Sequence, residues 1–168
     1  RPTGQVLGTM YELDGTPARA DPRHVLARVV ERVEAAGYTP VIAVELEFYL
    51  LERDQEGRLV PSAGLLTGER RTRIDAYGLA RLDDMAPVFD DLYAAARALG
   101  LPMRTLMSEY APGQFEITLE HRADALRAVD EAIVFKRAVR GVAARHGRVA
   151  CFMAKPFAHQ AGSGMHLH

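Results

Sequence analysis

The chain has 168 residues, of which 48% are hydrophobic and 26% are charged, a mix typical of one globular domain or a large part of one. The net charge is −1, so the composition gives no general attraction to nucleic acid or to an anionic membrane. No apolar run approaches the roughly 20 residues that span a bilayer, and the amino terminus lacks a signal-peptide pattern. The single Cys151 excludes an internal disulfide, so we expect a cytoplasmic protein in which Cys151 is a small core residue.

The first predicted elements in chain order are a strand, a helix and a second strand. A short strand is predicted at Gln5–Glu12. The helix begins at Asp21, a favoured N-cap, with Pro22 at its first position, and ends near Gly37. Its predicted apolar stripe consists of Val25, Leu26, Val29, Val30 and Val33. The second strand lies in the β-rich run Val41–Leu51.

The remainder of the chain alternates between predicted helices and strands. The polar stretch 53–73 is a predicted loop, and amphipathic helices are predicted at Asp83–Leu99 and at 124–146. The apolar positions of the last helix are Leu126, Val129, Ile133, Val139 and Val142. The further predicted strands are Met103–Met107, Gln114–Leu119, Val149–Met153 and Met165–His168. This order predicts an α+β fold, an α/β sandwich with helices packed on one side of a sheet.

Two carboxylates interrupt the apolar strand VIAVELEFYLL, residues 41–51. Because side chains alternate along a strand, Glu45 and Glu47 point to the same face. An edge strand with a solvated face would account for an isolated pair of this kind. Here, however, Ala43 and Tyr49 share that face and do not favour solvent. Two carboxylates among apolar neighbours repel each other and are poorly solvated unless a cation or hydrogen bonds compensate them.

A second set of carboxylates lies in SEYAPGQFEITLEH, residues 108–121. Glu116 shares a strand face with Gln114 and Thr118, and Glu109 precedes the Pro-Gly turn closely enough to fold back towards Glu116. Four glutamates from two β segments can form a hard oxygen-rich site suited to Mg²⁺ or Mn²⁺. Paired carboxylates also serve glycoside hydrolysis, which the absence of Trp and of an aromatic sugar platform disfavours.

The third notable stretch is AGSGMHLH, residues 161–168. His166 and His168 share a strand face, and the glycines before them allow a ligand to approach the backbone closely. A cloning linker that runs into a truncated histidine tag is an alternative source of such a sequence. The native-like stretch that precedes it, CFMAKPFAHQAG, favours a natural sequence instead.

Taken together and in this order, the blocks VELEF, PGQFE and FMAKP–GSGMHLH resemble the glutamine synthetase family. The resemblance covers almost the whole chain and implies the fold of that family's catalytic domain. It implies that Glu45 and His166 are ligands of the metal on the ATP phosphates, whereas Glu47, Glu109 and Glu116 are ligands of a second metal beside the amino acid and the amine. It also places Gly162 in the loop that contacts bound glutamate, and His168 where the family touches the nucleotide. Lys155 matches the family's KP block, but the resemblance assigns it no role in a reaction step.

The resemblance implies an ATP-dependent carboxylate–amine ligase that uses two or more Mg²⁺ or Mn²⁺ ions and forms a γ-glutamyl amide through an acyl phosphate. Ala161 replaces a residue that is commonly Asn in glutamine-forming members, and Leu106-Met107-Ser108 replaces a bacterial histidine run. The PGQFE spacing also lacks the one-residue insertion of the main bacterial enzyme of the family. These departures favour the γ-glutamylpolyamine synthetase branch, with putrescine or a relative as the amine; glutamine synthetase proper, which uses ammonia, is the alternative.

The resemblance also implies how much of the family's architecture the sequence contains. The chain begins at Arg1 and stops at His168 within a predicted strand, so we expect residues 1–168 to be the amino-terminal and middle part of the catalytic domain. A β-grasp domain and a carboxy-terminal half would be missing. Family sites form between subunits of large rings, so a homo-oligomer is implied. A non-catalytic relative and another metal-binding α/β hydrolase remain the rival hypotheses.

Overall fold

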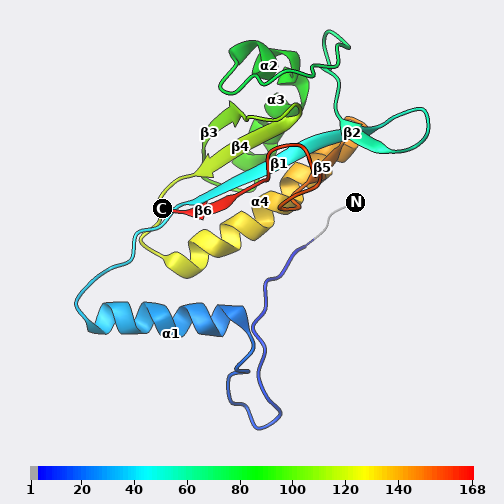
Figure 1. Cartoon of the computed structure of the whole chain (residues 1–168). Helices are drawn as coiled ribbons and strands as arrows, with labels where there is room; N and C mark the ends of the chain where they lie inside the picture. The colour runs from blue at the N-terminus through cyan, green and yellow to red at the C-terminus, as the bar shows by residue number, and fades with distance from the viewer. Residues whose placement is uncertain (1–3) are drawn as a thin grey trace.

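The computed structural model describes residues 4–168 and contains an antiparallel sheet centred on one long strand, β1 (Val44–Arg53). Strand β1 pairs with β4 (Gln114–Leu119), which in turn pairs with β3 (Met103–Ser108). Three short strands, β2 (Leu59–Pro61), β5 (Val149–Cys151) and β6 (Met165–Leu167), also pair with β1. Segments far apart in the sequence therefore meet on β1, as Figure 1 shows.

Residues 4–168 form four helices (Figure 1). They are α1 (Pro22–Ala35), α2 (Leu79–Asp84), α3 (Ala86–Ala98) and α4 (Ala125–Arg145). Helices α3 and α4 pack against each other and cover the sheet, which confirms the predicted α+β architecture. Among the helices of residues 4–168, none combines the length and the apolar character needed to cross a bilayer.

The hydrophobic core forms between α3, α4 and one face of the sheet because the strands alternate. In β1, the side chains of Val44, Leu46, Phe48 and Leu50 are at most 2% exposed and point towards the helices. Phe115, Ile117 and Leu119 of β4 do the same. The intervening residues of both strands face away from the helices. This alternation creates a second face, called the open face because the helices of residues 4–168 do not cover it, and the carboxylates lie there.

Helix α1 begins as predicted but does not bury its apolar stripe. The Asp21 side chain accepts a hydrogen bond from the Arg23 backbone N–H at 2.8 Å, and the helix ends before Gly37, which has a φ of 86°. The helix is attached to α4 by a two-pronged ion pair between Arg23 and Asp130, with N–O distances of 3.1 and 2.7 Å. None of its residues is fully buried within this chain.

The structure differs from three predicted elements in kind. Gln5–Glu12 is not a strand, since its contribution to pairing is one isolated bridge between Tyr11 and Pro17. The helix predicted at Asp83–Leu99 is two helices that meet at Met85, because Pro87 lacks the N–H that a continuous helix requires. The predicted loop 53–73 contains β2, which forms a hairpin with the end of β1.

Only some of the apolar positions predicted for α4 are buried. Val139 and Val142 are buried as expected, but Leu126, Val129 and Ile133 instead line an apolar groove beside α1 and residues 6–8. In the first half of α4 the buried positions are Ala125, Ala128 and Ala132, and Ala132 belongs to the core against the sheet. Small side chains let a helix approach a sheet closely, and a pattern based on large apolar residues does not detect them. Cys151 is free and half-buried against the small cluster around Tyr49, close to the core position expected for it.

The buried Asp84 ties the loop after β2 to α2 and should make the fold sensitive to acid. Its carboxylate accepts hydrogen bonds from Thr67 N, Thr67 Oγ1 and Leu66 N at 2.9, 2.9 and 3.2 Å. Burial alone would raise the pKa of Asp84, but these hydrogen bonds outweigh it and hold the pKa below its usual value. The carboxylate therefore stabilises the fold above its unfolded-state pKa of about 3.9, and this contribution is lost as the pH falls through the lower folded-state pKa.

We expect Asp84→Ala to lower the free energy of unfolding at pH 7 by about 1–3 kcal/mol, the usual cost of leaving buried donors unsatisfied. Compared with wild type, it should also show a weaker loss of stability below about pH 4. Urea unfolding at a series of pH values measures both effects. Asp83→Ala, at the exposed neighbouring position, is the control, and equal pH slopes for wild type and Asp84→Ala would contradict this account.

Candidate metal and substrate site

The open face of the sheet gathers three glutamates through the pairing of β1 with β4. Glu47 lies directly opposite Glu116 in the antiparallel register, and Glu45 lies two residues away on the same face of β1. Each of the three carboxylates has an oxygen within 4.8 Å of an oxygen of the others. Alternation in β1 and register with β4 together produce this convergence.

Burial makes the cluster electrostatically unfavourable by itself. Glu116 is only 7% exposed. Its burial, followed by the negative charges of Glu45, Glu109 and Glu47, raises the pKa of Glu116 to about 7. Within residues 4–168, these glutamates form ion pairs only through Glu45, whose partners are two histidines. A divalent cation would neutralise the repulsion, and three carboxylates are a ligand set that Mg²⁺ or Mn²⁺ accepts, so the residues fit the ion.

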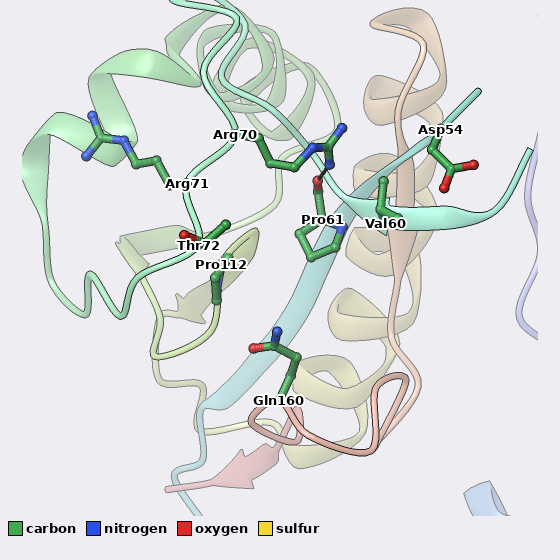
Figure 2. A pocket seen from close by; sticks show the side chains of 8 residues that line it. All are labelled: Asp54, Val60, Pro61, Arg70, Arg71, Thr72, Pro112 and Gln160. Carbon is green, nitrogen blue, oxygen red and sulfur yellow. Dashed lines mark hydrogen bonds between the residues drawn. The ribbon is translucent and has the colours of Figure 1, made fainter. Parts of the chain in front are cut away.

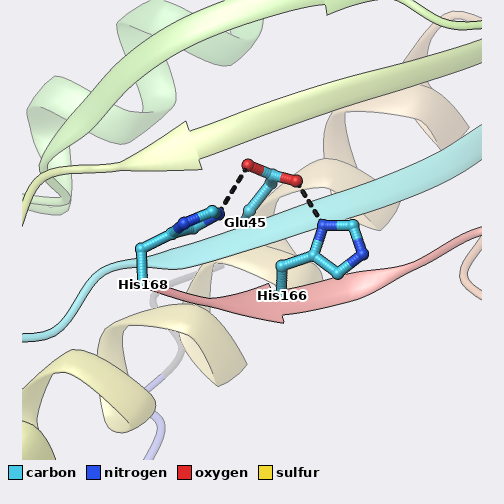
Figure 3. Close-up of side chains that lie close together, drawn as sticks. All are labelled: Glu45, His166 and His168. Atoms are coloured by element: carbon cyan, nitrogen blue, oxygen red, sulfur yellow. Dashed lines mark hydrogen bonds and ion pairs between the residues drawn. The ribbon is translucent and has the colours of Figure 1, made fainter.

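His166 of β6 and His168, directly after that strand, flank Glu45 (Figure 3). His166 Nδ1 lies 2.5 Å from Glu45 Oε1, and His168 Nε2 lies 3.1 Å from Glu45 Oε2. The hydrogen bond to Glu45 raises the pKa of His166. For Glu45, burial opposes ionisation, but the hydrogen bonds from both histidines outweigh it and lower the carboxyl pKa. Glu45 with both histidines forms a second group of ligand atoms within 4.8 Å of one another.

Glu109 lies at the edge of this cluster. Its backbone N–H donates to Gln114 O at 2.9 Å across the turn, and its carboxylate accepts from Tyr110 N at 3.0 Å. Its negative charge contributes to the raised pKa of Glu116. It does not belong to the tight group formed by Glu45, Glu47 and Glu116.

A model of the glutamine synthetase catalytic domain matches residues 19–168 of this chain. The chain belongs to the glutamine synthetase family. Its open carboxylate face and its α+β fold are therefore a partial glutamine synthetase catalytic domain.

Individual relatives agree with this assignment. The chain is 44% identical over 167 residues to γ-glutamylputrescine synthetase PuuA of Escherichia coli K12, with 98% of this chain and 35% of that protein covered. It is 38% identical to a glutamine synthetase of Thermus thermophilus, with 98% and 35% covered. A crystal structure of a glutamine synthase homologue superposes with a TM-score of 0.77 at 27% identity, covering 96% and 34%. The chain thus spans about a third of the length of these relatives.

Gly162 and Lys155, which the family resemblance also singled out, lie in the segment before β6. Gly162 lies in an irregular loop. The Gly162 carbonyl accepts a hydrogen bond from Gln114 Nε2 at 2.8 Å. A β-carbon added at Gly162 would lie 2.9 Å from Ala154 O, so the loop requires glycine there. The Lys155 ammonium donates to Gln160 O within the same loop. A glutamate-binding role for Gly162 and a nucleotide-binding role for His168 stay predictions.

Two buried polar residues beneath the cluster were not assigned a role from the sequence. Gln114 is 1% exposed and its amide contacts Glu47, while the Tyr49 hydroxyl donates to Ala161 O at 2.5 Å. Burial raises the pKa of Tyr49 to about 12, with a further contribution from the Glu47 charge, so the phenol remains a donor. Strand alternation could have placed both residues in the site, since their side chains occupy the same sheet face as the glutamates.

A separate hollow of about 330 Å³ lies beside the β2 hairpin (Figure 2). Its lining residues are Asp54, Val60, Pro61, Arg70, Arg71, Thr72, Pro112 and Gln160. None of them belongs to the carboxylate cluster, and Arg70 is held by Pro61 O and by Glu52. The hollow is therefore distinct from the candidate metal site.

Proposed function

We propose that this chain forms the amino-terminal and middle part of the catalytic domain of an ATP-dependent ligase that joins glutamate to an amine. The observation that carries the proposal is the convergence of Glu45, Glu47 and Glu116 on the open face of the sheet. Identity of 44% to a γ-glutamylputrescine synthetase supports the reaction class. The relatives are about three times as long, so further site residues would come from outside this segment.

Each site residue has a proposed role within that ligase. Glu45 and His166 would hold the ion on the ATP phosphates, whereas Glu47, Glu109 and Glu116 would hold a second ion beside the glutamate. Bound ions of this kind offset the repulsion between an attacking carboxylate and a phosphate. The loop at Gly162 would contact the glutamate, and His168 would contact the nucleotide.

The reaction proceeds in two displacements. A γ-carboxylate oxygen of glutamate attacks the γ-phosphorus of ATP, ADP leaves, and a γ-glutamyl phosphate remains. The amine nitrogen then attacks the acyl carbon, and inorganic phosphate leaves as the amide forms. The attacking amine must be neutral and must lose a proton, so a carboxylate near the acyl carbon is needed to accept it. An anionic pocket attracts the alkylammonium form that precedes this step.

The proposed amine is putrescine or a related polyamine. The wording of the EYAPGQFEITL block and Ala161 favour this branch, and the 44% identity to the putrescine enzyme supports it. Glutamine synthesis from ammonia is the second candidate, supported by the 38% identity to a Thermus glutamine synthetase. A non-catalytic relative would be expected to have lost metal ligands, but all five predicted ligands are present in this segment. A homo-oligomeric ring with sites between subunits is part of the proposal.

The test is to assay the complete protein with ATP, Mg²⁺ and glutamate against a panel of amines. We expect phosphate release with putrescine to exceed release with ammonia at least about tenfold, in line with the discrimination that one pocket provides. Release with ammonia alone would replace the polyamine proposal by glutamine synthesis. The absence of phosphate release with every amine would contradict the ligase proposal itself.

A further inference from the structure

We propose that Gln114 is a positioning residue that couples the cation site at Glu47 to the substrate loop, defined as residues 161–164. This inference rests on the proposed function, because it takes Glu47 as a metal ligand and the substrate loop as the glutamate contact. Gln114 itself would touch neither metal nor substrate. It would act by holding the two groups that do.

Both the nitrogen and the oxygen of the Gln114 amide have hydrogen-bond partners. Its Nε2 donates to Glu47 Oε2 at 2.9 Å and to Gly162 O at 2.8 Å, which uses both of its hydrogens. Its Oε1 accepts from the Ala111 backbone N–H at 3.2 Å. The side chain is 1% exposed, so water does not compete for these bonds. One rigid amide therefore fixes both a carboxylate of the cluster and a carbonyl of the substrate loop.

The substrate loop has two further anchors on β1. The Tyr49 hydroxyl donates to Ala161 O at 2.5 Å, and the Glu47 backbone N–H donates to Gly164 O at 3.1 Å. Three of the four loop carbonyls are therefore bound to the sheet. These anchors differ in a useful way, because the Tyr49 side chain contacts the loop but makes no hydrogen bond to Glu47, whereas the Gln114 side chain contacts both.

The shared amide has a thermodynamic consequence. A cation that fixes the Glu47 carboxylate also orders Gln114 and, through it, the carbonyl of Gly162. Glutamate that orders the substrate loop acts on Glu47 by the same route. Binding free energies are reciprocal, so each ligand should raise the affinity for the other by the same factor. An amide suits this position because a carboxylate would repel Glu47 and an apolar side chain would hold neither partner.

The experiment measures Mn²⁺ affinity by electron paramagnetic resonance in the complete protein, with and without saturating glutamate, together with the KM for glutamate. The variants are Gln114→Met, Gln114→Glu and Tyr49→Phe. Gln55→Met, the same substitution in an exposed turn, is the control. Thermal unfolding and circular dichroism identify any variant that does not fold, and Tyr49→Phe, which removes one oxygen, then still tests the loop anchor.

We expect both Gln114 variants to weaken Mn²⁺ binding by about 10-fold to 100-fold, the usual effect of removing a group that orients a metal ligand. The KM for glutamate should rise, and the gain in Mn²⁺ affinity on adding glutamate should fall towards one. Tyr49→Phe should raise the KM for glutamate and leave Mn²⁺ affinity without glutamate within about twofold of wild type.

Two failures are distinguishable. If wild type turns over glutamate but folded Gln114→Met keeps its Mn²⁺ affinity and its coupling, the positioning role is wrong while the ligase proposal stands. If Tyr49→Phe weakens Mn²⁺ binding as much as Gln114→Met does, the effect is a general loosening of the sheet and the specific coupling is contradicted. If wild type binds Mn²⁺ but turns over glutamate with no amine, the ligase proposal fails with the inference that rests on it.

Discussion

Replacing Glu116 by glutamine is expected to reduce turnover of the complete protein at least about a thousandfold without unfolding it. A metal that loses one of its carboxylates loses several kcal/mol of charge stabilisation, and each 1.4 kcal/mol corresponds to tenfold in rate. Glu47→Ala should have a comparable effect, because Glu47 pairs directly with Glu116 across β1 and β4. The measurement is phosphate release at saturating ATP and glutamate.

Although Glu116→Gln should lower turnover, it should not lower the stability of the metal-free fold. Because burial and neighbouring charges raise the Glu116 pKa from 4.5 to about 7, the carboxyl costs the fold stability as the pH rises from about 4.5 to about 7, and this loss is complete above pH 7. Without metal at pH 8, the variant should therefore be at least as stable as wild type. With Mn²⁺, wild type should gain more stability than the variant, since the stabilisation by a ligand that binds the native state grows with the logarithm of its affinity.

The control for this prediction is Glu120→Gln, at an exposed position just beyond β4. Glu120 has an ion pair with Arg104 at 3.8 Å and no contact with the cluster, so its replacement should leave rate and metal affinity unchanged. Near-normal turnover by Glu116→Gln or Glu47→Ala would contradict the proposed metal roles.

Replacing Gly164 by alanine is expected to weaken metal binding at the same site, because the added methyl group would displace its ligands. A β-carbon on Gly164 would lie 2.9 Å from Glu47 Oε1 and 2.9 Å from His166 Nε2. These contacts are too short, so at least one of the two proposed ligands must move away. Ligand geometry tolerates displacements of only a few tenths of an ångström, so Gly164→Ala should weaken Mn²⁺ binding by about 10-fold to 100-fold.

Gly141→Ala is the matched control for Gly164→Ala. Gly141 lies in the middle of α4, and an added β-carbon would have no atom within 4 Å. Alanine is the better helix former, so this variant should gain about 1 kcal/mol of stability and keep its metal affinity. Equal Mn²⁺ affinities for wild type and Gly164→Ala would show that Glu47 and His166 do not bind metal from these positions.

Local patterns in the sequence were sufficient for part of the site. Alternation predicted that Glu45 and Glu47 share a face, and that His166 and His168 share one, and the structure confirms both arrangements. Local patterns do not specify register: they suggested one oxygen-rich site shared by the two β segments, and only the family resemblance assigned Glu47 and Glu116 to the same metal. The family blocks carried that long-range information because they appear in a fixed order.

Features that depend on tertiary packing were less predictable. The hydrogen bonds of Gln114 join residues 47, 114 and 162, and no local signal specifies that an amide will meet both partners. The first half of α4 packs through alanines, which an apolar pattern weights weakly. Gln5–Glu12 has scattered apolar residues but finds no adjacent strand in this chain beyond the bridge at Tyr11. Strand formation requires a partner, and composition does not supply one.

Crystals of the complete protein soaked in Mn²⁺ and measured at the manganese absorption edge would locate bound ions directly. We predict at least two anomalous peaks per subunit on the open face of the sheet, one next to Glu45 and His166 and one next to Glu47, Glu109 and Glu116. Saturated crystals with no peak beside these side chains, or with those carboxylates turned towards bulk water, would contradict the account.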